Sequence, residues 1–214
     1  MVRRAAVTAT IGLVLSGCVT GAFQYSPPSP RAPVPNSGTI QRPLDEVWKT
    51  AIPRLGQRFF VINTIDRTSG LINVSYSGAP EQYVDCGQIT SEVKNLRGER
   101  THAFPAAASH KIYEATENGK LFVIDRSMRL EGRINLIFES LDTNTTKVTA
   151  ATRYVLTRTI VSQQTGFPPG PTLTDTISFT SGQGATFERG NNSVTCNPTG
   201  VLEATLVRII ELGD

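Results

Sequence analysis

The sequence of 214 residues is poor in the side chains that most often carry catalysis or hold metals. It has two histidines, three cysteines and one tryptophan. A zinc site takes about four cysteine or histidine ligands at regular spacing, and His102 and His110 form no such pattern with the cysteines. The chain also lacks a G-x-S-x-G elbow, a phosphate-binding loop and an H-E-x-x-H pair. We therefore expect no metal, no cofactor and no enzymatic activity.

A large excess of one charge and a membrane-spanning run are also lacking. The chain has 21 basic and 18 acidic residues, and Arg3 and Arg4 carry two of the three excess positive charges. Nucleic-acid binding needs a dense basic face, so nucleic acid is not an expected partner. The apolar run near the start, residues 5–14, is well short of the roughly 20 residues that cross a bilayer as a helix.

That short apolar run belongs to a targeting pattern. A positive segment with Arg3 and Arg4 precedes it, and residues 15–17 (Leu-Ser-Gly) lead from it to Cys18. Here the chain resembles bacterial lipoproteins, whose lipobox ends in the cysteine that is lipidated. The resemblance implies that residues 1–17 are a signal peptide, cleaved before Cys18, and that Cys18 carries a diacylglyceryl thioether and an acylated amine. An ordinary signal peptide, cut after small residues, is the alternative.

The same resemblance implies a location. Two or three acyl chains hold a protein on a membrane, because each buried methylene contributes about 0.8 kcal/mol. In the sorting rule of bacterial lipoproteins, Asp directly after the lipidated cysteine retains the protein at the inner membrane, whereas this chain has Val19. We therefore expect a lipid anchor in the outer membrane and a domain that faces the periplasm.

Prolines are crowded into the segment after the anchor, between Pro27 and Pro35. Such a segment cannot form a helix or a central strand, and it favours a semi-extended polyproline conformation of roughly 3 Å per residue. The sequence predicts that residues 18–38 are the lipidated cysteine and a proline-rich tether, and that residues 39–214 are the folded domain. A partner-binding role of the tether is the alternative.

If Cys18 is lipidated, Cys86 and Cys196 remain as a pair. In an oxidising periplasm an even pair is most simply one disulfide. The alternative, a metal site, lacks ligands.

The hydrophobic patterns predict helices at both ends of the domain. Pro43 fits the first turn of a helix whose core stripe is Leu44, Trp48, Ala51 and Leu55, and Pro53 predicts a break near Ile52. At the C-terminus, Asn197 fits an N-cap and Pro198 the first helical position. Leu202, Leu206, Ile209 and Ile210 form the apolar face of this second helix, with Glu203, Arg208 and Glu211 on the other.

Between these helices the sequence predicts strands. The clearest are two hairpins, the second with the Asn118-Gly119 pair that a type I′ turn prefers. A loop is expected over residues 97–100. The expected strands are residues 59–66 and 71–76, 88–93, 111–116 and 120–125, 133–141, 147–160, 175–180 and 185–188. The predicted fold class is α+β, with a single domain in which a curved antiparallel sheet packs against an N-terminal and a C-terminal helix.

One part of this pattern has a family resemblance. Residues 43–48 (PLDEVW), 59–63 (FFVIN) and 66–74 (DRTSGLINV) are similar to the start of BamC-like helix-grip lipoproteins. The resemblance covers about 40 residues. It implies a helix-grip fold in the cell envelope and no catalytic residue.

The densest charge cluster offers the candidate site. It contains Arg126, Arg129, Glu131 and Arg133. Opposite charges on one face of a strand most often make solvated cross-strand pairs. The alternative is a partner-docking edge, because arginine binds carboxylates in bidentate fashion and is enriched at interfaces.

These observations favour a non-enzymatic outer-membrane lipoprotein. Its periplasmic domain is expected to bind another envelope protein as an assembly or stabilising subunit. The alternative is a module that binds a lipid or another hydrophobic ligand between the sheet and Leu202, Leu206 and Ile209. An enzyme would require His102 or His110 beside a buried carboxylate.

The lipobox makes a direct prediction. The Cys18→Ala variant should accumulate as an uncleaved precursor without acyl chains, because the acceptor sulfur is gone. Mass spectrometry of the protein from the membrane fraction measures both properties. Normal processing and acylation of this variant would contradict the lipoprotein interpretation.

Overall fold

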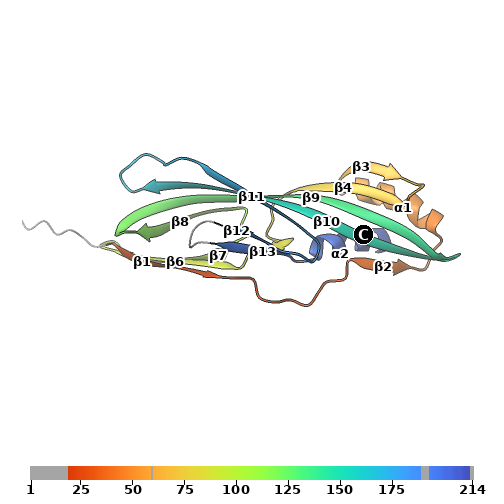
Figure 1. Ribbon diagram of the computed structural model, residues 1–214, viewed down its shortest axis with the longest axis horizontal. Coiled ribbons are helices and arrows are strands. Elements are labelled where there is room, and N and C mark those ends of the chain that lie inside the picture. Colours follow the sequence, from red (N-terminus) through yellow and green to blue (C-terminus); the bar gives the residue numbers. More distant parts are fainter. Residues whose placement is uncertain (1–18, 59, 189–192, 213–214) are drawn as a thin grey trace, which may run out of the picture.

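Two long antiparallel strands run along most of the length of the molecule (Figure 1). The structure is a computed structural model that describes residues 19–58, 60–188 and 193–212, so Cys18 and residues 1–17 lie outside the described residues. Strand β9 (Lys120–Asp142) pairs with β10 (Thr145–Gln164) from one end to the other. At roughly 3.3 Å per residue, β9 is about 70 Å long.

Shorter strands pair with both outer edges of this long hairpin. On the β9 side lie β8 (His110–Glu117) and β4 (Leu71–Gly78), and β3 (Val61–Asp66) pairs with β4. On the β10 side lie β11 (Leu173–Thr180) and β2 (Ser37–Ile40). The result is one seven-stranded sheet in which each long strand has two different neighbours along one edge.

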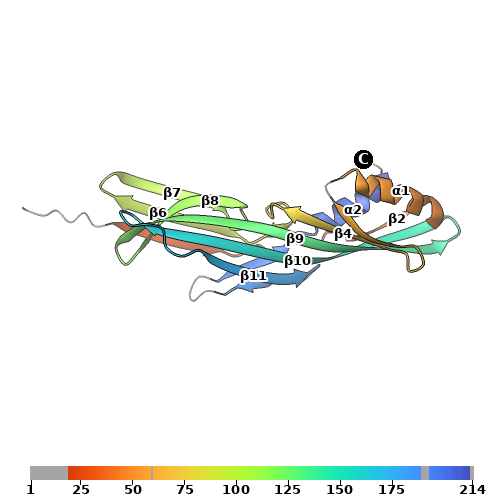
Figure 2. The same ribbon diagram turned by 90° about the horizontal axis from the view of Figure 1, so that it is seen from above.

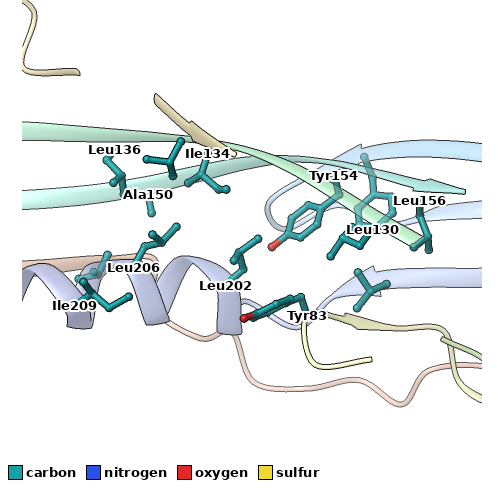
Figure 3. Close-up of a cluster of buried hydrophobic side chains, with 14 of the residues drawn as sticks. Tyr83, Leu130, Ile134, Leu136, Ala150, Tyr154, Leu156, Leu202, Leu206 and Ile209 are labelled. Atoms are coloured by element: carbon teal, nitrogen blue, oxygen red, sulfur yellow. The ribbon is translucent and has the colours of Figure 1, made fainter. Parts of the chain in front are cut away.

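At one end of the molecule, two helices cover the inner face of this sheet (Figures 1 and 2). Helix α1 (Leu44–Gly56) buries Val47, Trp48, Ala51 and Leu55, and the Trp48 ring meets Phe138 edge-on at 5.1 Å. Helix α2 (Val201–Leu212) points its apolar side chains toward β9 and β10 (Figure 3). The apolar stripes that the sequence predicts for the two helices are therefore the faces that pack in the core.

At the other end, two small sheets cover the same inner face. One consists of β1 (Thr20–Ser26), β6 (Gln88–Asn95) and β7 (Gly98–Pro105), and the other of β5 (Val84–Asp85), β13 (Val194–Pro198) and β12 (Ala185–Phe187). Figure 1 shows the first of them alongside the end of the long hairpin that is far from the helices, and the second nearer the middle, where β13 leads into α2. The molecule is thus α+β, and its second half is built from strands alone.

Local turn chemistry predicted the hairpins correctly. The β3–β4 hairpin and the β8–β9 hairpin both form, and the latter turns at Asn118 and Gly119, whose φ angles are 51° and 71°. Both values are in the left-handed region that a type I′ turn requires. The C-terminal helix also forms, together with a helix that begins directly after Pro43.

The proline-rich tether is corrected by the structure. Residues before the first proline form β1, which pairs with β6, and the Tyr25 hydroxyl donates to the Thr195 carbonyl at 3.1 Å and accepts from the Thr195 N–H at 2.9 Å. The prolines themselves follow the body of the domain, held by an Arg31–Asp85 ion pair at 3.0 Å and by two hydrogen bonds between Asn36 and Ala150. The proline segment is extended, as expected. It lies along the folded domain, however, and is not a spacer between the domain and the N-terminus.

Three expected boundaries also differ. Helix α1 continues through Pro53 to Gly56. Pro53 has no N–H to donate to the Lys49 carbonyl, but both residues are exposed, so water can supply the missing donor. Asn197 and Pro198 end β13, and α2 begins at Val201, after Gly200.

The third difference concerns β7, which covers the expected loop at residues 97–100. Only the two residues before Gly98 form the turn between β6 and β7. Likewise, the expected strands 120–125 and 133–141 are parts of the single strand β9. Its alternation of buried and exposed residues continues without interruption through the charged stretch between them.

Cys86 and Cys196 are joined in a disulfide that closes 110 residues and links the loop after β5 to β13. Both cysteines are fully buried. Reducing it, or replacing both cysteines by serine, should lower the free energy of unfolding by about 4–5 kcal/mol, because the unfolded chain gains freedom. Urea unfolding of the oxidised and reduced forms measures the difference. Two titratable thiols in the unreduced, unfolded protein would contradict it.

Candidate functional site

The outer face of the long hairpin carries most of the charge cluster. Arg129, Glu131 and Arg133 lie at alternate positions of β9 and are all exposed. The inner face of the same strands is covered by the helices and small sheets. Because alternate residues of a strand share a face, these three side chains form one row on the open surface.

The row extends onto β10, where Arg153 lies directly opposite Arg133. Like charges in such a cross-strand pair repel each other. Within the described part of the chain, neither arginine makes an ion pair or a side-chain hydrogen bond. Arg129, by contrast, donates to the Ser77 hydroxyl from Nη2 at 2.9 Å and from Nε at 3.2 Å. The Arg133–Arg153 pair therefore presents two guanidinium groups whose donors are free for a ligand.

A row of hydrogen-bonded amides lies beside the two arginines. Asn73 Nδ2 donates to Asn135 Oδ1 at 2.6 Å, and Asn63 Nδ2 donates to Asn73 Oδ1 at 2.8 Å. Together with Arg133 and Arg153, Asn73 and Asn135 line a shallow hollow of about 480 Å³. We call this surface, with Arg129 and Glu131, the arginine face. It offers fixed donors on a rigid sheet.

Arg126 does not belong to the arginine face, although it was grouped there from the sequence. It is 2% exposed and points into the interior, where its Nη2 donates to the Ala106 carbonyl at 2.5 Å. Burial, reinforced by nearby Arg158, lowers the pKa of Arg126 to about 10. The signal was available in the sequence, since Arg126 is an odd number of residues from Arg129 and so lies on the other face of a continuous strand.

A second buried arginine accompanies it. Arg158 is 3% exposed, pairs with Asp175 at 2.8 Å and stacks over the Phe187 ring, with its central carbon 4.3 Å from the ring centre. Within the described residues, Arg126 Nη1 and Arg158 Nε have no hydrogen-bond partner. The strand-only half of the molecule thus has a charged interior.

Neither histidine lies beside a deeply buried carboxylate. His110 Nε2 is 2.9 Å from Asp125 Oδ1, and both side chains are more than half exposed. His102 Nε2 is 3.9 Å from Glu114 Oε2, which Arg100 Nε also contacts at 2.5 Å. The Glu114 side chain is 23% exposed. The condition that would have indicated an enzyme is therefore not met by these two pairs.

A buried hydrogen-bond network around Glu203 was missed from the sequence, which placed this residue on the outer face of its helix. Glu203 is 1% exposed. It accepts the Tyr154 hydroxyl at 2.8 Å and the Ser181 hydroxyl at 2.6 Å, while Ser181 Oγ accepts the Thr152 N–H at 2.7 Å. These contacts attach the first turn of α2 to β10 and to the loop after β11, so they fix where the helix lies.

The space expected to hold a hydrophobic ligand is occupied by the protein. Leu202 and Leu206 are fully buried and point toward Ile134, Leu136 and Ala150 (Figure 3). A separate groove of about 260 Å³ lies beside α2. Its walls are Phe60, Tyr76, Tyr83 and Ile209, with Arg58, Thr205 and Arg208.

Comparison with protein-family models, with curated proteins and with solved structures gave no match for this chain. Among residues 19–58, 60–188 and 193–212, no helix has the length and apolar character to cross a membrane. The same residues contain no group of three or more histidine, cysteine and acidic side chains that could hold a metal ion.

The tyrosines make the folded state sensitive to high pH. The pKa of each of the chain's five tyrosines is raised, mainly by burial. For Tyr154 the nearby Glu203 charge raises the pKa further. Above pH 10 the unfolded chain therefore binds fewer protons than the folded one, and stability is lost as pH rises. Arg126 acts in the opposite direction, but it is one group against five.

Urea unfolding at pH 8, 9, 10 and 10.5 checks this expectation. The midpoint should fall between pH 9 and 10.5, and the fall should be smaller in Tyr154→Phe, which has lost the tyrosine with the largest shift. A midpoint that does not change over this range would contradict the assignment of buried, protonated tyrosines.

Proposed function

We propose that this protein is a non-enzymatic outer-membrane lipoprotein whose periplasmic domain binds another envelope protein as an assembly or stabilising subunit. The observation that carries the proposal is the cross-strand pair Arg133 and Arg153, which lies exposed and without an acidic partner among the described residues. A carboxylate from a partner would relieve the repulsion between these side chains and would accept their donors in bidentate fashion.

The setting of the arginine face supports protein binding. The sheet beneath it is built on two long paired strands, and hydrogen-bonded amides lie at its side, so little ordering is needed when a partner binds. Arginine is also enriched at interfaces. The partner should present a carboxylate to Arg133 and Arg153, and a hydrogen-bond donor or a positive charge to Glu131 beside them.

The order of elements supports the resemblance to helix-grip lipoproteins. A short strand, a helix and a hairpin (β2, α1, β3 and β4) are followed by the long hairpin and by a final helix against the sheet. We propose that this half is a helix-grip unit and that the strand-only half is an addition to it.

The groove beside α2 supports a second candidate, a module for a hydrophobic ligand. Its aromatic walls suit an apolar chain, and Arg58 and Arg208 at its edge suit an acidic head group. This groove lies beside α2 and is not the space between α2 and the sheet that the sequence indicated as the alternative ligand site.

Co-purification distinguishes the two candidates. The mature lipoprotein is tagged, isolated from its own cells in gentle detergent, and its bound proteins and lipids are identified by mass spectrometry. We expect a stoichiometric envelope protein whose recovery falls at least tenfold, equivalent to about 1.4 kcal/mol, when Arg133→Glu and Arg153→Glu are combined.

Arg58→Glu combined with Arg208→Glu is the matched control, since it reverses two exposed arginines elsewhere. Equal loss of the protein partner in both double variants would contradict a specific role of the arginine face. A lipid that is lost only from the control variant, with no protein partner in any sample, would favour the groove instead.

A further inference from the structure

The end of the molecule opposite the helices gathers four separate chain segments. Strand β1 begins there at Thr20, which pairs with Lys94 near the end of β6. The β8–β9 turn lies close by, as does the loop after β10, whose Thr165 N–H donates to the Leu121 carbonyl at 2.9 Å. Figures 1 and 2 agree that these turns lie at the end where β1 starts, far from α1 and α2.

Two of these segments carry exposed apolar side chains at their tips. Leu96, in the β6–β7 turn, is 85% exposed, and Phe167, in the loop after β10, is 58% exposed. Leu96 is the most exposed of the large apolar side chains among the described residues. Exposing such apolar side chains to water is unfavourable, and burying them against an apolar surface is favourable.

The charge around the tips is close to balanced. Lys94 pairs in register with Glu99, and Lys120 with Glu117, so each exposed lysine has an acidic residue opposite it. Arg97, next to Leu96, is exposed and has no ion pair in the described part of the chain. The tips therefore combine apolar side chains with one spare positive charge, which suits contact with a phospholipid surface.

The N-terminal attachment constrains where this end can be. Only Val19 separates Cys18 from β1, which begins at Thr20. Two residues span at most about 7 Å, so an acyl chain on Cys18 would hold the start of β1 within a head group's distance of the bilayer. Strand β6 is antiparallel to β1 and ends at Asn95, one residue past the partner of Thr20, so Leu96 follows directly at the end where β1 begins.

We propose that this end of the molecule lies on the lipid bilayer, with Leu96 and Phe167 inserted among the lipids and Arg97 beside the phosphates. The inference rests on the proposed lipidation of Cys18, and it adds an orientation. The long strands then stand away from the membrane, α1 and α2 lie farthest from it, and the arginine face is presented to the side.

Fluorescence quenching in a bilayer tests this orientation. The mature lipoprotein is reconstituted in nanodiscs of phosphatidylethanolamine and phosphatidylglycerol, and an environment-sensitive fluorophore is attached at Leu96→Cys or at Phe167→Cys. The label is specific, because Cys86 and Cys196 form the disulfide and Cys18 would carry the lipid. Spin-labelled phospholipid in the same bilayer serves as the quencher.

Leu141→Cys is the matched control. Leu141 is also apolar and 56% exposed, but it lies at the helix end, next to the turn between β9 and β10. We expect quenching at positions 96 and 167 to be at least fivefold stronger than at position 141. All three sites are exposed, so labelling leaves the core intact, and an unchanged melting temperature confirms this for each variant.

Two failures are distinguishable. Mass spectrometry of the N-terminal peptide precedes reconstitution, and a Cys18 without acyl chains would overturn both the anchor and the orientation that rests on it. An acylated protein whose three labels are quenched equally would overturn the orientation alone and leave the anchor in place.

Discussion

The backbone ladder between β9 and β10 holds together two halves that otherwise share few elements. It runs from the pairing of Phe122 with Gln164 to that of Asp142 with Thr145. At the helix end, β4 and β2 pair with its outer edges, and at the strand-only end β8 and β11 do so. Since both halves are built on the same two strands, their spacing and relative twist are set by one continuous set of hydrogen bonds.

The two halves differ in what they bury beneath this ladder. The helix end buries mainly apolar side chains, with Leu55, Ile72, Leu136 and Leu206 fully buried, and its buried Glu203 accepts hydrogen bonds from two hydroxyls. The strand-only end contains two buried arginines. Arg126 donates to a backbone carbonyl, and Arg158 pairs with a carboxylate and stacks on an aromatic ring. Buried charges are costly unless they are paired, so the two ends should differ in local stability although one sheet connects them.

The sequence predicted the parts of the fold whose interacting residues are close together along the chain, and missed those whose partners are far apart in sequence. The β3–β4 and β8–β9 hairpins were predicted because their turns are encoded locally, for example by Asn118 and Gly119. Strand β1 was missed because its partner, β6, lies about 70 residues later and the prolines after Tyr25 dominated the pattern. The start of α2 was predicted too early. Asn197 and Pro198 are typical of a helix N-terminus, but they can equally end a strand, as they do in β13.

The candidate site shows the same dependence. Alternation along a strand correctly groups Arg129, Glu131 and Arg133, and it would have separated Arg126 from them had β9 been predicted as one strand. Arg153 could not be assigned to the cluster, because its position opposite Arg133 follows from the register of the long hairpin. Burial of Glu203 depends on hydroxyls from Tyr154 and Ser181, which no local pattern connects to it.

The pairing of early strands with later ones has a consequence for the time course of folding. Strands β8, β9 and β10 are consecutive hairpins that can form early, whereas β1 needs β6 and β2 needs β10. Helix α2 then packs next to β2, where Arg42 donates to the Glu211 carbonyl at 3.3 Å. A chain that emerges N-terminus first therefore carries β1 unpaired until β6 has emerged, and β2 unpaired until the start of β10 has emerged, beyond residue 145. Unpaired edges are exposed to aggregation during these intervals.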